Sequence, residues 1–91
     1  RIESDIAEEP SVDLFEDQVL ERIVARAFGK LKPDAQMILK LYSEGLTFSE
    51  IAARMGLKNE AYARRKKYLS KEALISLIKK DPEYRDYFGF R

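Results

Sequence analysis

Residues 47–69 constrain the fold more than any other part of the chain, because two helical patterns meet there at a glycine. Thr47 and Glu50 stand three residues apart, in the T-x-x-E arrangement whose side chains cap the start of a helix. The apolar residues that follow have the spacing of one buried helix face, namely Phe48, Ile51, Ala52 and Met55. Gly56 comes next, and glycine ends a helix at low cost because it adopts a positive φ. These signals predict a helix of about two turns that begins at Phe48 and ends at Met55.

A second helix is predicted directly after a short corner. Asn59 can cap its start, and the residues that follow include the cationic run Arg64-Arg65-Lys66-Lys67. A short helix, a corner of roughly 3–4 residues and a basic helix are together typical of a helix-turn-helix, whose second helix enters a DNA groove. Four cations in a row are also usual on a solvated helix face, and any two packed helices can have such caps. We favour the helix-turn-helix because all of these signals occur together.

The rest of the chain has helical patterns and no alternating strand pattern. Residues 1–10 are acidic and are interpreted as a linker. From Ser11 an apolar stripe with helical spacing continues for about five turns, formed by Val12, Phe15, Val19, Ile23, Ala27 and Phe28, with Leu20, Val24 and Leu31 alongside. Pro33 suits the first position of a further helix that Gly45 closes, and Asp81-Pro82 ends a long helix that begins near Glu60. We therefore predict an all-α domain over residues 11–91, a bundle of four to five helices that contains the helix-turn-helix.

Two further apolar groups are expected to contribute to the core. The second half of the long helix should be held in it by one apolar stripe, formed by Leu69, Ala73, Leu74, Leu77 and Ile78. The aromatic residues at the end of the chain should cover the core rather than bind a partner, and these are Tyr84, Tyr87, Phe88 and Phe90.

Charge is distributed unevenly along the chain, although the net charge of the whole is only +1. Residues 1–21 contain eight carboxylates and one cation, a net charge of −7, whereas residues 58–80 contain eight cations and two carboxylates, a net charge of +6. This separation predicts a polyanionic partner for residues 58–80, and an acidic arm that stays away from that partner.

Composition excludes several classes of function. The chain contains neither Cys nor His, which removes a zinc site, a thiol nucleophile and the usual general base. No catalytic constellation of carboxylates is visible, so we expect no enzyme activity, no cofactor and no metal. No apolar run approaches the ~20 residues that cross a bilayer, and the lack of cysteine favours the cytoplasm. Because the chain begins at Arg1 rather than Met, we expect a fragment of a longer protein or a processed product.

The sequence of residues 31–52, LKPDAQMILKLYSEGLTFSEIA, resembles the start of region 4 in the sigma-70 family of RNA polymerase sigma factors. The family pattern there is a helix begun by proline, then L-x-x-x-G-[LM]-[ST], then [EQ]-I-A and a glycine turn. Residues 58–68, KNEAYARRKKY, are similar to the recognition helices of extracytoplasmic-function-like members. The resemblance covers about residues 12–80. Response-regulator output domains share much of the same pattern, so another helix-turn-helix regulator remains an alternative.

The resemblance implies a module that reads the upstream promoter element while it is bound to the flap of RNA polymerase core. Residues that it places at base edges or nearby phosphates are Asn59, Glu60, Ala61, Arg64 and Arg65. Residues that it places at the DNA backbone are Lys58, Lys66, Lys67 and Tyr68. Thr47 and Ser49 complete the predicted DNA-binding residues, and an anti-sigma factor is a further implied partner.

The chain departs from the family pattern at one place in the recognition helix. An apolar residue is usual at or near the positions of Arg65 and Lys66, and neither residue is apolar. The alternative is a register displaced by one residue, with Tyr62 or Ala63 facing inward. A third class of function also remains open, a helical protein-interaction domain that uses its acidic arm and binds no DNA.

Overall fold

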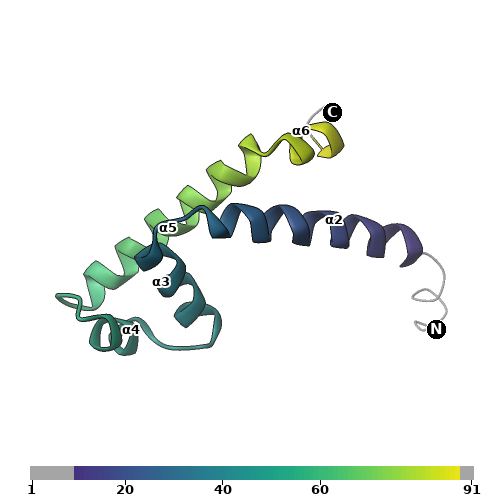
Figure 1. Ribbon diagram of the computed structural model, residues 1–91. Coiled ribbons are helices and arrows are strands. Elements are labelled where there is room, and N and C mark those ends of the chain that lie inside the picture. The colour runs from purple at the N-terminus through teal and green to yellow at the C-terminus, as the bar shows by residue number, and fades with distance from the viewer. Residues whose placement is uncertain (1–9, 89–91) are drawn as a thin grey trace, which may run out of the picture.

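The computed structural model describes the backbone of residues 10–88 and the side chains of residues 18–88. Within residues 10–88 all regular secondary structure is helical (Figure 1), in the order α2 Pro10–Gly29, α3 Pro33–Ser43, α4 Phe48–Met55, α5 Glu60–Lys80 and α6 Pro82–Phe88. The predicted all-α fold is confirmed, and α6 is the short fifth helix that the sequence left open. The acidic linker predicted for residues 1–10 lies outside the described residues except for Pro10, which begins α2 because proline suits a first helical turn.

Capping side chains set the limits of α4 and the start of α5. The Thr47 hydroxyl accepts a hydrogen bond from the Glu50 amide at 3.1 Å, and the Glu50 carboxylate accepts one from the Thr47 amide at 2.8 Å. Gly56 closes α4 in the left-handed region, with a φ of 69°. The Asn59 side-chain oxygen then accepts a hydrogen bond from the Tyr62 amide at 2.8 Å. The predicted boundaries are confirmed because these groups satisfy backbone amides that no helix can pair internally.

The main core lies between α3, α4 and the first half of α5. Its buried members are Ile38, Leu41, Ile51, Ala52 and Ala63. Half-buried apolar residues surround this cluster, namely Leu39, Leu46, Phe48, Met55 and Leu57. Ala63 is the contribution of α5, and its small side chain allows the helix backbone to approach α3 and α4 closely. The basic first half of α5 is therefore fixed firmly to the rest of the molecule.

One face of α2 packs against α5 and α6. Its buried residues recur every fourth position, as Val19, Ile23 and Ala27, and Leu31 continues the series beyond the helix end. The predicted stripe is confirmed for these four residues, whereas Leu20 alongside them is 39% exposed. A helix that packs on one side buries only one narrow stripe, so the neighbouring apolar positions stay partly in water. Val12 and Phe15, also predicted in the stripe, lie outside the described side chains.

The second half of α5 is less buried than its apolar stripe predicts. Two residues of the stripe are exposed and three are half-buried, in the order Leu69 and Ala73, then Leu74, Leu77 and Ile78. The prediction that the core holds this half was therefore wrong for Leu69 and Ala73. The reason is that α3 and α4 pack on the first half of α5, whereas α2 and α6 cover the second half from one side (Figure 1).

The aromatic residues of α6 cover a different part of the molecule from the main core. α6 packs against α5 and α2, at the end of α5 that is remote from α4 (Figure 1). Its rings pack on one another, with centroids 5.2 Å apart for Tyr84 and Phe88 and 4.9 Å apart for Tyr87 and Phe88. All three are half-buried, and Phe90 lies outside the described residues. The prediction placed these rings over the core, whereas they lie where α2 meets the end of α5.

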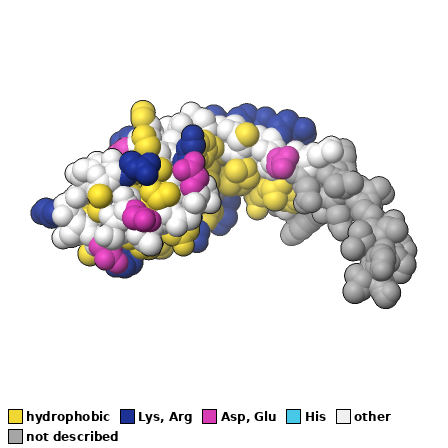
Figure 2. All heavy atoms as spheres, turned by 90° about the horizontal axis from the view of Figure 1, so that it is seen from below, with side chains coloured by type: hydrophobic (Ala, Val, Ile, Leu, Met, Phe, Trp, Pro, Cys, Tyr) yellow, Lys and Arg dark blue, Asp and Glu magenta, His cyan; other side chains and the backbone are white. Residues whose placement is uncertain are grey.

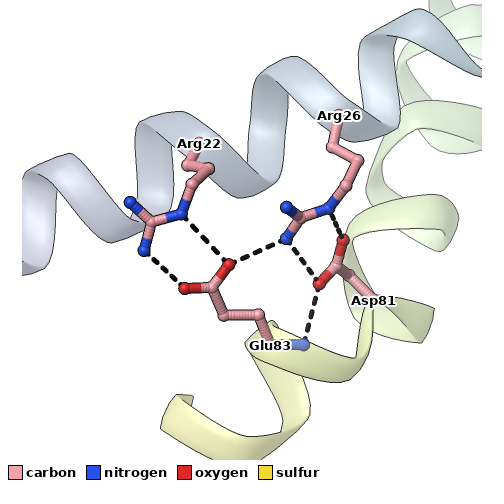
Figure 3. Close-up of polar contacts among 4 residues, drawn as sticks. All are labelled: Arg22, Arg26, Asp81 and Glu83. Atoms are coloured by element: carbon pink, nitrogen blue, oxygen red, sulfur yellow. Dashed lines mark hydrogen bonds and ion pairs between the residues drawn. The ribbon is translucent and has the colours of Figure 1, made fainter.

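Two arginines of α2 attach this helix to the junction of α5 and α6 (Figure 3). Arg26 donates two hydrogen bonds to the Asp81 carboxylate, at 2.8 and 3.0 Å, and a third to Glu83 at 2.8 Å. Arg22 also donates two hydrogen bonds to Glu83. Asp81 is only 4% exposed. Its carboxylate accepts a hydrogen bond from the Glu83 backbone amide at 2.8 Å, and this hydrogen bond caps the start of α6. We call these four residues the α2–α6 clamp.

Candidate nucleic-acid interface

The first half of α5 presents a cationic surface whose orientation is fixed by Ala63. Ala63 is fully buried against α3 and α4, whereas Tyr62 is 48% exposed. Of the two residues that the sequence offered for the inward position, Ala63 is therefore the buried one, and the register relative to the family pattern stays a prediction. Arg64 and Arg65 are exposed because they follow Ala63 around the helix and away from the core.

Arg64 lies on the flank of α5 that faces α4. Its guanidinium group is 3.0 Å from the Glu60 carboxylate, one helical turn earlier, and both side chains are 57% exposed. The same guanidinium group lies over the Phe48 ring, 5.1 Å from its centroid. Arg64 is thus accessible to a ligand but already held by one carboxylate and one ring.

Lys67 lies on the same flank, one turn further along α5. Its ammonium group is 4.3 Å from the centroid of the Tyr42 ring, within the range of a cation–π contact. Tyr42 and Phe48 stack on each other with centroids 5.5 Å apart and an interplanar angle of 20°. Two rings therefore support two cations, and sequence reasoning missed both aromatic residues as parts of the site. The available signal was their position on either side of the Gly45 turn.

Lys66 lies on the opposite flank and pairs with α3. Its ammonium group is 2.7 Å from the Asp34 carboxylate, and the Lys66 side chain is only 24% exposed. The hydrogen bond from Lys66 lowers the pKa of Asp34. The predicted contact of Lys66 with a DNA backbone thus competes with an ion pair inside the molecule.

Arg65 is the exposed cation of the Arg64-Arg65-Lys66-Lys67 run that no ion pair within residues 18–88 engages. Lys58, before the helix, and Tyr68, one turn after Arg64, are also exposed. Glu60 and Ala61 are exposed at the start of α5, as are Thr47 and Ser49 at the start of α4.

Three of the predicted site residues have structural roles as well. The Asn59 oxygen caps α5 and the Thr47 hydroxyl caps α4, so each atom already accepts one hydrogen bond from the backbone. Glu60 accepts a hydrogen bond from Arg64. The assignments of these residues to DNA contacts stay predictions.

A groove runs beside Arg65, between α5 and the junction of α2 and α3. It encloses about 540 Å³, and apolar side chains of Leu31, Leu69 and Leu77 line it. Lys30, Lys32 and Arg65 also line this groove, so cations surround an apolar floor. Leu69 is 50% exposed there. Sequence reasoning missed this groove because its two sides, within residues 30–35 and 62–77, are separate in the sequence.

The face seen from below in Figure 2 has no uniform field of cations. Lys and Arg side chains lie there in separate groups, with hydrophobic side chains between them and Asp or Glu side chains beside several.

The part of the chain that the structure describes has neither a candidate metal site nor a membrane-spanning helix. No three acidic side chains there gather as metal ligands would. No helix in the same residues combines the length and apolar character that a membrane crossing requires.

Comparison with protein-family models, with curated proteins and with solved structures finds no match for this chain. The function must therefore be argued from the site. Chemically, the exposed arginines can donate paired hydrogen bonds to a guanine edge or to a phosphate, and the lysines can neutralise phosphates.

Proposed function

We propose that this chain binds double-stranded promoter DNA in transcription initiation, as the part of a sigma factor that reads the upstream promoter element on RNA polymerase. In this proposal α4 and α5 form a helix-turn-helix, and α5 is the recognition helix. The observation that supports it most is the exposure of Arg65, which has no ion-pair partner within the described residues, on a helix that Ala63 holds by its opposite face. The sequence resemblance to sigma region 4 supports the specific role. Transcription in turn requires the cytoplasm.

The DNA contacts in this proposal are of two kinds. Lysines and arginines that neutralise phosphates release counterions, which makes the affinity fall steeply with salt on every sequence. An arginine that reaches the major groove bonds to two acceptors of guanine, and only this contact gives sequence preference. Arg65 is the residue that we assign to the second kind.

The proposal is tested by selecting duplexes from a random library with the purified chain and then measuring affinity by fluorescence anisotropy. We expect a selected duplex to bind more tightly than a scrambled duplex of the same composition, and affinity to fall linearly with salt on a logarithmic scale. Equal affinity for the two duplexes contradicts sequence-specific reading. A salt-independent affinity contradicts the phosphate contacts. No binding at low salt contradicts DNA binding altogether and leaves the helical interaction domain.

We propose that the polymerase flap, or an anti-sigma factor, binds in the groove beside Arg65. The exposed Leu69 and the apolar floor of this groove, about 540 Å³ in volume, support this assignment. Exposed apolar surface of this kind is typical of protein-binding sites rather than of contacts with DNA phosphates. Leu69→Ser should weaken binding to RNA polymerase core while leaving the affinity for a selected duplex unchanged. Leu20→Ser, at a similarly exposed position on α2, is the matched control and should change neither. Unaltered binding of the Leu69→Ser variant to core contradicts this assignment.

A further inference from the structure

Two stacked aromatic rings support two of the cations of α5 from outside that helix. Tyr42 belongs to the last turn of α3 and Phe48 to the first turn of α4, and the two rings are nearly parallel with centroids 5.5 Å apart. Arg64 lies 5.1 Å from the Phe48 centroid and Lys67 lies 4.3 Å from the Tyr42 centroid. Because Arg64 and Lys67 are three residues apart, they lie on one flank of α5. The 5.5 Å between the two ring centroids is similar to the distance between side chains one turn apart on a helix, so each ring lies under one cation.

This arrangement is not explained by core packing alone. Tyr42 is 44% exposed, and it lies outside the group of apolar side chains that pack around Ile38 and Ile51. A cation–π contact at an exposed site stabilises a fold only slightly. A ring beneath each cation limits the rotamers that the long side chains of Arg64 and Lys67 would otherwise sample in water.

We propose that Tyr42 and Phe48 are positioning residues that hold Lys67 and Arg64 as a fixed pair of phosphate contacts. The inference rests on the proposed DNA-binding function and deepens it. It moves Arg64 from base reading to the backbone, and it leaves sequence preference to Arg65. The positions agree with this division, because Arg64 faces α4 and is engaged by Glu60 and Phe48, whereas Arg65 lies on the other flank of α5 with no ion pair within the described residues.

The physical gain comes from preorganisation. Binding normally orders each long side chain that it engages, and that loss of rotamer freedom weakens the complex. A cation over a ring face still presents its N–H groups outward, so a phosphate can bind without displacing the ring. Arg64 donates a hydrogen bond to Glu60 in the free protein, so it must exchange this hydrogen bond for one to the phosphate when DNA binds.

The first experiment removes the exposed ring and retains its apolar volume. Tyr42→Leu should lower the affinity for selected and scrambled duplexes alike by up to about tenfold, the scale expected when the positioning of one long side chain, Lys67, is lost. Tyr42→Phe keeps the ring and should bind as the parent protein does. In a Lys67→Gln background, Tyr42→Leu should cause no further loss, because the side chain that the ring holds is already neutral.

These outcomes separate the inference from the function on which it rests. If the parent chain prefers no duplex and shows no salt-dependent binding, the proposed function fails, and the inference fails with it. If the parent binds DNA but Tyr42→Leu retains full affinity, only the inference is overturned. A loss that persists in the Lys67→Gln background also overturns it, because the ring then acts through the fold rather than through Lys67.

A second measurement is independent of DNA and of folding losses. In the parent protein the ε-methylene protons of Lys67 should be shifted upfield by the Tyr42 ring current, and Tyr42→Phe should preserve that shift. Tyr42→Leu should return these protons to the chemical shift of an exposed lysine. Unshifted protons in the parent protein contradict the positioning role directly. The same pair of tests applies to Phe48→Tyr and Phe48→Leu with Arg64, accompanied by thermal unfolding because Phe48 also packs against the core.

Discussion

At the scale of single residues, neighbours in the sequence have different surroundings. Arg64 is held by Glu60 and Phe48, whereas no ion pair within the described residues engages Arg65. We therefore predict that Arg65→Ala lowers the affinity for a selected duplex by ~1–3 kcal/mol and removes the preference at one base pair. Arg64→Ala should weaken binding to all duplexes equally. Affinities for duplexes that differ at single positions distinguish the two effects, and the reverse pattern would exchange the two roles.

Glu60 is the second residue whose role follows from its contacts. Its carboxylate accepts a hydrogen bond from the Arg64 guanidinium group at 3.0 Å. It also lies at the start of α5, where DNA phosphates would approach. Glu60→Gln should therefore raise the affinity for every duplex by about two- to fivefold, the scale of one exposed charge. Glu72→Gln, further along α5, serves as the control and should change affinity less. Unchanged affinity at low salt after Glu60→Gln would show that Arg64 does not have to exchange partners.

The sequence limited the inward residue of α5 to two candidates and did not indicate its aromatic neighbours. Ala63 was one of the two candidates because the resemblance to sigma region 4 implies an apolar residue near the cationic run. Tyr42 and Phe48 belong to different helices, and their stacking depends on the angle at which α3 and α4 meet. Periodicity within one helix contains no information about that angle.

At the scale of the secondary-structure elements, helix limits were predictable because their causes are local. Thr47, Glu50, Gly56 and Asn59 act on backbone groups within a few residues of themselves, and the ends of α4 and the start of α5 agree with the prediction. The burial of the second half of α5 was not predictable in this way. Its apolar stripe is a local property, but the helices that cover the stripe are not.

Gly56 allows a test of how much one local conformation contributes. Its φ of 69° lies in the left-handed region, and a Cβ added there would meet no atom within 4 Å, so any cost is conformational rather than steric. We predict that Gly56→Ala lowers the free energy of unfolding by about 1 kcal/mol. Gly29→Ala is the matched control, because an added Cβ has equal space there without a left-handed φ. Guanidinium unfolding measures both variants, and equal stabilities would contradict the conformational argument.

At the scale of the whole molecule, two regions are joined by side chains that are far apart in the sequence. The core of α3, α4 and α5 presents the candidate interface, and the α2–α6 clamp closes the other end of α5 (Figure 3). In the sequence, Arg22 and Arg26 are ordinary cations in the later part of a helix, and Asp81 is simply the residue before a proline. Nothing in their local pattern predicts that they meet across more than fifty positions.

The clamp predicts a loss of stability in acid. The hydrogen bond from Arg26 lowers the pKa of Asp81 to about 2, and the hydrogen bond from Arg22 lowers the pKa of Glu83 to about 2. In the unfolded chain both carboxyl groups have ordinary pKa values near 4. Because the folded values are the lower ones, the clamp stabilises the fold fully above about pH 5 and progressively less as the pH falls toward 2.

Unfolding by urea, which does not screen charges, at a series of pH values between 7 and 2.5 measures this loss. We expect the midpoint of the parent protein to fall with acid, and that of an Asp81→Asn, Glu83→Gln double variant to be lower at pH 7 and to change less below pH 5. Asparagine can still cap α6, so the double variant removes the charges without removing the turn. Glu72→Gln is the control, since no ion pair within the described residues includes Glu72, and it should keep the parent's dependence. If the double variant instead follows a curve parallel to that of the parent, other carboxylates are responsible for the acid sensitivity and the clamp contributes little to joining the two ends of the molecule.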